Sequence, residues 1–272
     1  MAVTALPVRW PAEAIWEAVA PVLPGFTVEV LPEVDSTNSE LMRRARAGRL
    51  DPVLLVAEQQ SAGRGRMGRQ WRSGAAQDCR APTALTVSLG MNLAPADWSG
   101  LSLAVGLSVA QSLHPEIRLK WPNDLWWHDR KLAGILIETV NWGEASASRY
   151  VVIGVGINLQ TPDAAGLSTA PVGLRELLPD VDAAQALLRM AAPLVQSVQH
   201  FEAHGFSPFQ KAFNTRDALA QLPVTLSDGL QGVAQGVDAT GALRVASAQG
   251  VQRITSAEVS VRVQPGPDYG HV

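Results

Sequence analysis

Hydrophobic and polar positions recur with two different periods along the chain, and these periods predict its helices and strands. Apolar spacing of the helical kind covers residues 11–20, 98–113, 182–203 and 208–219, and a further helix is expected to begin within Asp35–Asn38. Strands are expected over Phe26–Val34, Pro52–Ala57, Thr83–Leu89, Ile117–Trp121 and Arg149–Leu159. The last of these runs is apolar enough for a central strand.

Turn and capping residues refine these limits. Pro11 suits the first turn of a helix. Thr37 and Glu40 have the spacing of a capping box, and Gly48 stands where the same helix needs a C-terminal cap. A hairpin is expected from Leu125–His128 and Lys131–Val140, turning at Asp129-Arg130.

The pattern changes character after Ala220. Short β-runs over Val224–Val263 are separated by Asp228-Gly229, Thr240-Gly241 and Gln249-Gly250, which is typical of a small barrel or sandwich. We therefore expect a helical lead-in over 1–30, an α+β domain with a mixed sheet over 31–220, a small β-barrel over 221–264 and a tail over 265–272.

Composition restricts the class of protein. A chain of 272 residues with 47% hydrophobic and 17% charged residues can fill a core, and its net charge of −3 argues against general DNA or RNA binding. The single cysteine, Cys79, makes no internal disulfide, and the five histidines lack metal-ligand spacing. No apolar run is long enough to span a membrane and no signal peptide is evident, so a cytoplasmic location is expected.

The run GRGRMGRQW, residues 63–71, carries the strongest functional signal. Its glycines let the backbone approach a ligand, and its arginines present planar forks that suit phosphate and carboxylate oxygens. A nucleic-acid tether and an ordinary solvated loop are the alternatives. Strand-like sequence on both sides favours a loop that closes over an anion.

Three more polar clusters interrupt apolar sequence. Ser36-Thr37-Asn38 can cap a helix or bind a ligand, and Glu58-Gln59-Gln60 can be a solvated strand end or offer Gln60 to a neutral polar ligand. In KWPND (120–124), Asn123 and Asp124 occupy a loop between strands.

Two further candidate binding features follow KWPND in the chain, a lysine and a glycine-containing segment. Lys131, followed by Gly134, is either a solvated hairpin lysine or an inward ligand for phosphate. GVGIN (154–158) lacks the third glycine of a dinucleotide fingerprint. Its glycines are expected to let a flat ligand lie against a strand, with Asn158 close to a base or ribose.

In this order and spacing the clusters resemble the catalytic domain of biotin protein ligases. The segments that carry the resemblance are STN (36–38), GRGRMGRQW (63–71), KWPND (120–124), KLAGIL (131–136) and GVGIN (154–158), and GVAQGVDATGALRV (232–245) looks like the small β-barrel of that family. The resemblance implies ATP-dependent formation of biotinyl-adenylate, with Mg²⁺ beside ATP, followed by transfer of biotin to a lysine of a biotin carboxyl carrier protein.

The resemblance also assigns roles. Ser36, Thr37, Asn38, Gln60 and Gly134 would bind biotin. Arg64, Gly65 and Arg66 would enclose the carboxylate and phosphate, Lys131 would contact both, and Arg69, Trp71, Asn123 and Asn158 would serve the nucleotide. Lys131, Asp124 and Arg66 are the expected catalytic residues, with Asp124 orienting or deprotonating the incoming lysine.

Several alternatives stay open. A lipoate or octanoate ligase would share the fold, and a sensor would bind the adenylate without transferring it. Too few residues precede the match for the DNA-binding domain that many members carry, so no repressor function is expected. A homodimer through sheet edges is an open alternative. The segment after Trp71 is longer than the usual turn.

Overall fold

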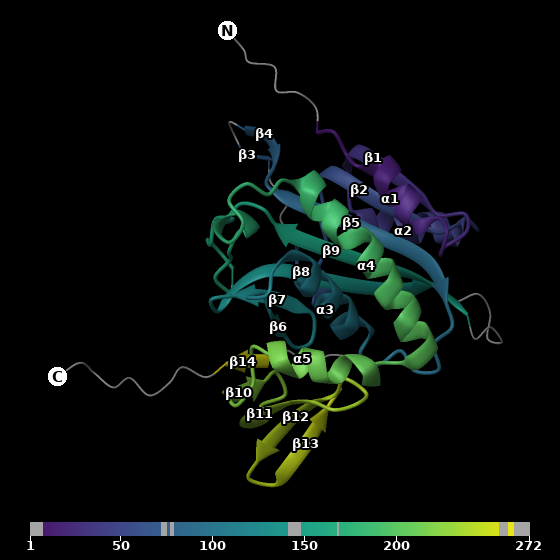
Figure 1. Cartoon of the computed structure of the whole chain (residues 1–272). Helices are drawn as coiled ribbons and strands as arrows, with labels where there is room; N and C mark the ends of the chain where they lie inside the picture. The colour runs from purple at the N-terminus through teal and green to yellow at the C-terminus, as the bar shows by residue number, and fades with distance from the viewer. Residues whose placement is uncertain are drawn as a thin grey trace.

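The computed structural model describes residues 8–71, 75–76, 79–140, 148–167, 169–255 and 261–263. It contains a large mixed sheet flanked by helices and a small separate antiparallel sheet below it, as Figure 1 shows. This arrangement confirms the expected α+β class. No helix among these residues is both long and apolar enough to cross a membrane.

The large sheet has seven strands in the order β1-β2-β5-β9-β8-β7-β6. Their bounds are Thr27–Val34 (β1), Val53–Gln60 (β2), Ala84–Leu93 (β5), Arg118–Lys120 (β6), Asp124–Trp127 (β7), Arg130–Val140 (β8) and Arg149–Asn158 (β9). Only β1 and β2 pair in parallel; the other neighbours are antiparallel. The strand Arg149–Asn158 is central, as expected from its apolar sequence.

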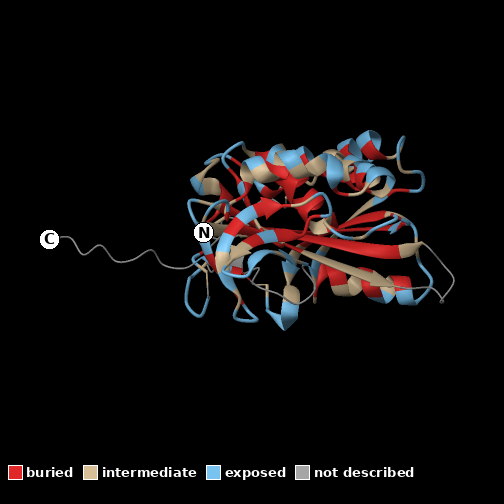
Figure 2. Ribbon diagram, turned by 90° about the horizontal axis from the view of Figure 1, so that it is seen from below, coloured by how far each residue is buried: buried red, intermediate tan, exposed pale blue. Residues whose placement is uncertain are grey.

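Helices cover both faces of this sheet. The helices α1 (Ala12–Val19), α3 (Leu101–Leu113) and α4 (Ala183–His204) pack on one face, and α2 (Thr37–Arg46) packs on the other. Alternate residues of β2 serve the two cores: Leu54 and Val56 face the larger one, whereas Val53 and Leu55 face α2. Figure 2 shows the buried residues concentrated in the sheet between these layers.

The C-terminal sheet has five strands in the order β13-β12-β11-β10-β14. They span Pro223–Leu226 (β10), Gln231–Val237 (β11), Leu243–Ser247 (β12), Gly250–Ile254 (β13) and Val261–Val263 (β14), and α5 (Gln210–Arg216) precedes them. A small all-β unit was expected here. Within the described residues β13 and β14 do not pair, so the sheet has two edges where the sequence had suggested a barrel.

Short elements complete the chain. Three single 3₁₀ turns span Arg66–Gly68 (η1), Leu174–Glu176 (η2) and Ser207–Phe209 (η3). The small hairpin of β3 (Ala75–Ala76) and β4 (Cys79–Pro82) follows the loop 63–71. It occupies part of the long segment noted after Trp71, and the rest of that segment lies outside the described residues.

Two of the local expectations were wrong by one residue. The N-cap of α2 is Ser36, whose side chain accepts from the Ser39 backbone N–H, so Glu40 is one position too late for a capping box. Glu40 pairs with Arg43 and Arg44 instead. The hairpin between β7 and β8 turns at His128 and Asp129, which both have positive φ, as a type I′ turn requires.

Two helix limits also differ from the sequence pattern. The helix expected over 98–113 begins only at Leu101, after Gly100 with a φ of 84°. The helix expected over 208–219 ends at Arg216, because Asp217 is extended and forms a parallel bridge with Leu119 of the strand before KWPND. This bridge joins the small sheet's lead-in to the large sheet.

Candidate functional site

One pocket on the α2 side of the large sheet collects every residue for which a binding or catalytic role was expected from the sequence. Its lining includes Ser36, Thr37, Asn38, Gln60, Arg64, Gly65, Arg66, Arg69, Trp71, Asn123, Asp124, Lys131, Gly134 and Asn158. These residues come from α2 and its N-cap, from the ends of β2 and β9, from β7 and the turn before it, from β8, and from the loop Gly63–Trp71, which we call the Arg loop. Their separate motifs therefore form one site, although the ligand that each residue contacts stays a prediction.

The inner wall of the pocket is a hydrogen-bonded polar cluster of Thr37, Asn38, Gln60 and Ser88. The backbone N–H and the hydroxyl of Thr37 both donate to Gln60 Oε1, at 2.8 and 3.1 Å. The Ser88 hydroxyl lies 2.7 Å from Thr37 Oγ1 and 2.6 Å from Asn38 Oδ1. Thr37, Asn38 and Ser88 are buried, so the cluster holds fixed polar groups in an otherwise apolar wall.

Strand pairing explains why this polar cluster faces the pocket. Thr86 and Ser88 alternate along β5 with Leu85, Val87 and Leu89, which point into the larger core. Ser88 therefore projects toward α2. No sequence motif indicated that Thr86 or Ser88 belongs to the site. The one feature that could have indicated it is their alternation with apolar residues along the strand.

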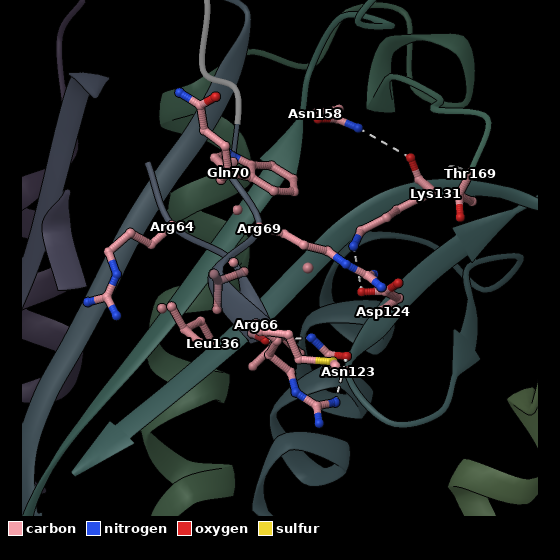
Figure 3. A pocket seen from close by; sticks show the side chains of 18 of the residues that line it. Arg64, Arg66, Arg69, Gln70, Asn123, Asp124, Lys131, Leu136, Asn158 and Thr169 are labelled. Atoms are coloured by element: carbon pink, nitrogen blue, oxygen red, sulfur yellow. Dashed lines mark hydrogen bonds and ion pairs between the residues drawn. The ribbon is translucent and has the colours of Figure 1, made fainter. Parts of the chain in front are cut away.

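A second group, the cationic cluster, lies at the other end of the pocket. It consists of Arg66, Arg69, Lys120 and Lys131, together with the carboxylate of Asp124. Figure 3 shows Arg69, Lys131 and Asp124 close together. Lys131 Nζ lies 2.7 Å from Asp124 Oδ1. The guanidinium of Arg66 donates to Asn123 Oδ1 at 3.2 Å, and Asn123 in turn donates to the Ile135 carbonyl.

Burial lowers the pKa of both Lys120 and Arg66. For Lys120 the nearby charges of Lys131, Arg69 and Arg262 act in the same direction, while Asp124 opposes them. For Arg66, Asp124 opposes the shift and Arg69 adds to it. Lys120 also lies over the Trp126 ring, with Nζ 4.5 Å from the ring centroid. Cations gathered this closely mark a region where an anion binds favourably.

Lys120 and Arg262 were missed as site residues. Lys120 belongs to the KWPND motif, which indicated a binding site. Roles in that site were expected for Asn123 and Asp124 but not for Lys120. Arg262 lines the pocket from β14 of the C-terminal sheet. Nothing in the local sequence of β14 indicated that this strand would reach a site built by residues far earlier in the chain.

The glycines of the GVGIN motif make room for side chains of the protein in this structure. A Cβ on Gly156 would lie 2.5 Å from Trp71 Cε2, and a Cβ on Gly154 would clash with the Asn38 side chain. Both glycines line the pocket, and a flat ligand against this strand stays a prediction. Gly134 pairs with Gly156 across the strands, and a Cβ on Gly134 would lie 3.5 Å from Trp71 Cζ3.

Asn158 is buried and fixes backbone beside the pocket. Its amide nitrogen donates to the carbonyls of Lys131 and Val172, at 3.2 and 3.3 Å. The first bond, shown in Figure 3, links the end of β9 to the start of β8, and the second links β9 to the segment that follows Pro171. Its donor group is thus used within the protein, and contact with a nucleotide stays a prediction for its oxygen.

The site therefore offers two adjoining chemistries. The polar cluster can hydrogen-bond an uncharged ring, and the cationic cluster can bring two anions together by offsetting their repulsion. The described residues contain no group of three or more His, Cys, Asp or Glu side chains that could hold a metal ion.

Comparison with known proteins agrees with this arrangement. Residues 31–158 match the Biotin/lipoate A/B protein ligase family, and residues 223–262 match the Biotin protein ligase C terminal domain. The chain is 32% identical to the Bifunctional ligase/repressor BirA of Escherichia coli, over 88% of this chain and 75% of the relative. It is also 32% identical to the Biotin--[acetyl-CoA-carboxylase] ligase of Paracoccus denitrificans, over 85% of this chain and 98% of the relative.

A solved structure shows the same relationship in three dimensions. The biotin protein ligase from Aquifex aeolicus in complex with biotin and ATP superposes with a TM-score of 0.73 at 26% identity, covering 87% of this chain and 99% of the Aquifex chain. The chain belongs to the Biotin/lipoate A/B protein ligase family and, within it, to the biotin protein ligases.

Proposed function

We propose that the protein activates biotin with ATP to form biotinyl-5′-AMP and then transfers the biotinyl group to a lysine of a biotin carboxyl carrier protein. The observation that carries the proposal is the presence of the polar cluster and the cationic cluster in one pocket. A relative from Paracoccus denitrificans named as a biotin--[acetyl-CoA-carboxylase] ligase, and the Aquifex structure with biotin and ATP, support this substrate pair.

In the first step the biotin carboxylate attacks the α-phosphorus of ATP, and pyrophosphate leaves. Both reactants are anionic, so fixed positive charge must offset their repulsion in the transition state. Arg64, Arg66 and Lys131 are our candidates for this task, with Arg69 serving the nucleotide. Among the described lining residues Asp124 is the single carboxylate. This donor set suits a Mg²⁺ ion that arrives on the phosphates of ATP and keeps most of its water.

Biotin discrimination is assigned to the polar cluster. A ureido ring presents N–H donors and a carbonyl acceptor, whereas a fatty chain presents neither. The hydroxyl and amide groups of Thr37, Asn38 and Gln60 match the ring together with the neighbouring Ser36, and Gly134 gives space beside it. A lipoyl or octanoyl chain could not use the hydrogen-bonding capacity of these groups, which disfavours it at this position.

In the second step the amine of the carrier lysine attacks the acyl carbon of the mixed anhydride, and AMP leaves. A free lysine has a pKa of about 10.4, so it must lose a proton before it can attack. Asp124 is our candidate to accept or orient that proton. Trp71 and Asn123 would hold the nucleotide side of the adenylate, and Asn158 would lie close to the adenosine.

The direct test is ATP-dependent transfer of biotin to a purified biotin carboxyl carrier domain, with lipoate and octanoate in parallel. Transfer of biotin alone is the expected result. Transfer of lipoate or octanoate would contradict the assigned substrate, and tight adenylate binding without transfer would indicate a sensor.

Lys131→Ala should abolish pyrophosphate release in the same assay. Lys211→Ala is the matched control, because Lys211 lies on α5, away from this pocket. Unchanged pyrophosphate release by Lys131→Ala would remove this lysine from the first step.

A further inference from the structure

Arg64 stands apart from the other cations of the Arg loop. Figure 3 shows its side chain directed away from Arg69, Lys131 and Asp124. Its guanidinium forms an ion pair with Glu138, with Nη2 3.0 Å from Oε1, and Nη1 lies 3.4 Å from the Ser39 hydroxyl. In this conformation Arg64 is thus paired with a carboxylate of the protein itself.

Glu138 is placed for this contact by strand β8. Gly134, Leu136 and Glu138 occupy alternate positions on the strand and so share the face that carries the pocket. Gly134 and Leu136 line the pocket, and Glu138 follows them one step farther along. The carboxylate therefore sits beside the pocket, within reach of the Arg loop.

The same carboxylate also holds the polar cluster. Asn38 Nδ2 donates to Glu138 Oε2 at 3.0 Å and to the Leu136 carbonyl at 3.2 Å. Glu138 thus accepts from Asn38 with one oxygen and pairs with Arg64 mainly through the other. It connects the wall predicted to bind biotin with the loop predicted to close over the carboxylate.

We propose that Glu138 is a positioning residue that holds Arg64 out of the anion-binding part of the pocket until the carboxylate of the ligand takes its place. The proposal rests on the proposed function, because it needs a ligand whose ring meets the polar cluster and whose carboxylate meets Arg64. Glu138 occupies the arginine while the pocket is empty, so a ligand that carries only an anionic group must compete with it.

The ion pair between Arg64 and Glu138 is weak enough for a ligand carboxylate to replace Glu138. The Arg64 side chain is 49% exposed and that of Glu138 is 20% exposed, so solvent screens much of their attraction. A ligand carboxylate that also gains the hydrogen bonds of the polar cluster can therefore displace it. Removing the charge of Glu138 should lower the biotin concentration at half-saturation by about two- to fivefold, the range of exposed ion pairs.

Glu138→Gln is the informative variant, because its amide oxygen can still accept from Asn38 while the charge is lost. The expected result in the biotin-transfer assay is a two- to fivefold lower half-saturating biotin concentration with kcat within twofold of wild type. Glu176→Gln is the matched control: Glu176 forms a comparable ion pair with Arg130 at 2.7 Å, outside the pocket lining. The control should leave both quantities unchanged.

Repeating the measurement in an Arg64→Gln protein distinguishes two explanations. Glu138 could compete with the ligand for Arg64, or it could only hold the Asn38 side chain in place. If Glu138 acts through Arg64, Glu138→Gln should have no effect on biotin binding in an Arg64→Gln protein, measured by calorimetry with biotin alone. Equal effects in both backgrounds, or weaker biotin binding by the single variant, would overturn the proposal. Failure of the wild-type protein to bind or transfer biotin would instead overturn the proposed function, so the two failures are distinguishable.

Discussion

Lys131 Nζ and Asp124 Oδ1 lie 2.7 Å apart at the cationic end of the pocket, so two residues expected to act at different stages are paired with each other. The register of β7 and β8 produces this contact: Asp124 pairs with Gly134 and Trp126 pairs with Lys131, and the irregularity between these pairs brings Lys131 to the face that carries Asp124. An anionic ligand that binds Lys131 would weaken this pair and leave the carboxylate of Asp124 available for another cation, such as the ammonium of an incoming lysine.

Asp124→Asn should therefore impair transfer more than adenylation. The amide keeps the shape of the side chain and can still accept a hydrogen bond, but it takes up a proton poorly. Loss of a general base typically costs 10²- to 10⁴-fold, so we expect single-turnover transfer from preformed adenylate to slow by at least about a hundredfold. Adenylation, followed by pyrophosphate release, should change by less than about tenfold on the same reasoning. Equal losses in the two steps would assign Asp124 to ATP or Mg²⁺ binding.

Arg66→Ala should release the reactive intermediate. Arg66 is held toward the cationic cluster by its contact with Asn123, and hydrogen bonds to charged groups contribute roughly 1.5–3 kcal/mol. Dissociation of biotinyl-adenylate should accelerate by about 10- to 150-fold, measured by trapping with excess unlabelled ligand. Arg46→Ala, at an exposed position at the end of α2, is the matched control. Wild-type retention by Arg66→Ala would refute the role given to the Arg loop.

Gly156→Ala should displace the Arg loop without unfolding the protein. The new methyl group would meet the Trp71 ring, which is a side chain on a loop and can move away. The displaced loop would carry Arg66 and Arg69 with it, so adenylate affinity should fall by about tenfold, a cost of roughly 1.4 kcal/mol. Equilibrium binding of the adenylate measures the effect.

The double variant Gly156→Ala/Trp71→Ala provides the control for that prediction. With the indole gone, the methyl group has nothing to displace, so the double variant should bind no more weakly than Trp71→Ala alone. Additive losses would show that Gly156 acts on the ligand directly rather than through Trp71.

The parts of the site that could be predicted from the sequence are those written as local motifs. The Arg loop is recognised by glycines and arginines at fixed spacing, and Lys131 by its place after a turn. Each of these patterns lies within a few residues of the chain, and the residues given roles from them line the pocket. Glu138 shows the opposite case. It accepts a hydrogen bond from Asn38, a hundred positions away in the chain. The mostly apolar sequence of its strand, β8, does not indicate this partner.

The errors in the fold have two origins. The turn at His128 and Asp129 is a local error of one residue, because the sequence does not say which neighbouring pair adopts positive φ. The helix α5 ends early because Asp217 forms a bridge with Leu119, far back in the sequence. Such contacts between distant segments override local preference. The order of strands β10 to β14 and the reach of Arg262 into the pocket are likewise properties of tertiary packing.

Asp217 gives a prediction about stability at the junction between the two sheets. Its carboxyl group is fully buried: Oδ1 accepts from the Leu219 backbone N–H, while Oδ2 has no partner among the described residues. Burial raises the pKa of Asp217 from 3.8 to about 6, with the Leu219 hydrogen bond and the charge of Arg118 opposing the shift. Between these two values the folded protein holds a proton that the unfolded chain has lost.

Folding stability from this group must therefore decrease as the pH rises through that window, because the folded state binds more protons than the unfolded state. From pH 5 to pH 7.5 the loss should be about 1–1.5 kcal/mol, at roughly 1.4 kcal/mol for each unit of pKa shift. Asp217→Asn removes the titration, so urea unfolding at the two pH values should show a smaller decrease for the variant by that amount. Equal pH dependence of wild type and variant would mean that Asp217 titrates near its ordinary value, with water or another group reaching Oδ2.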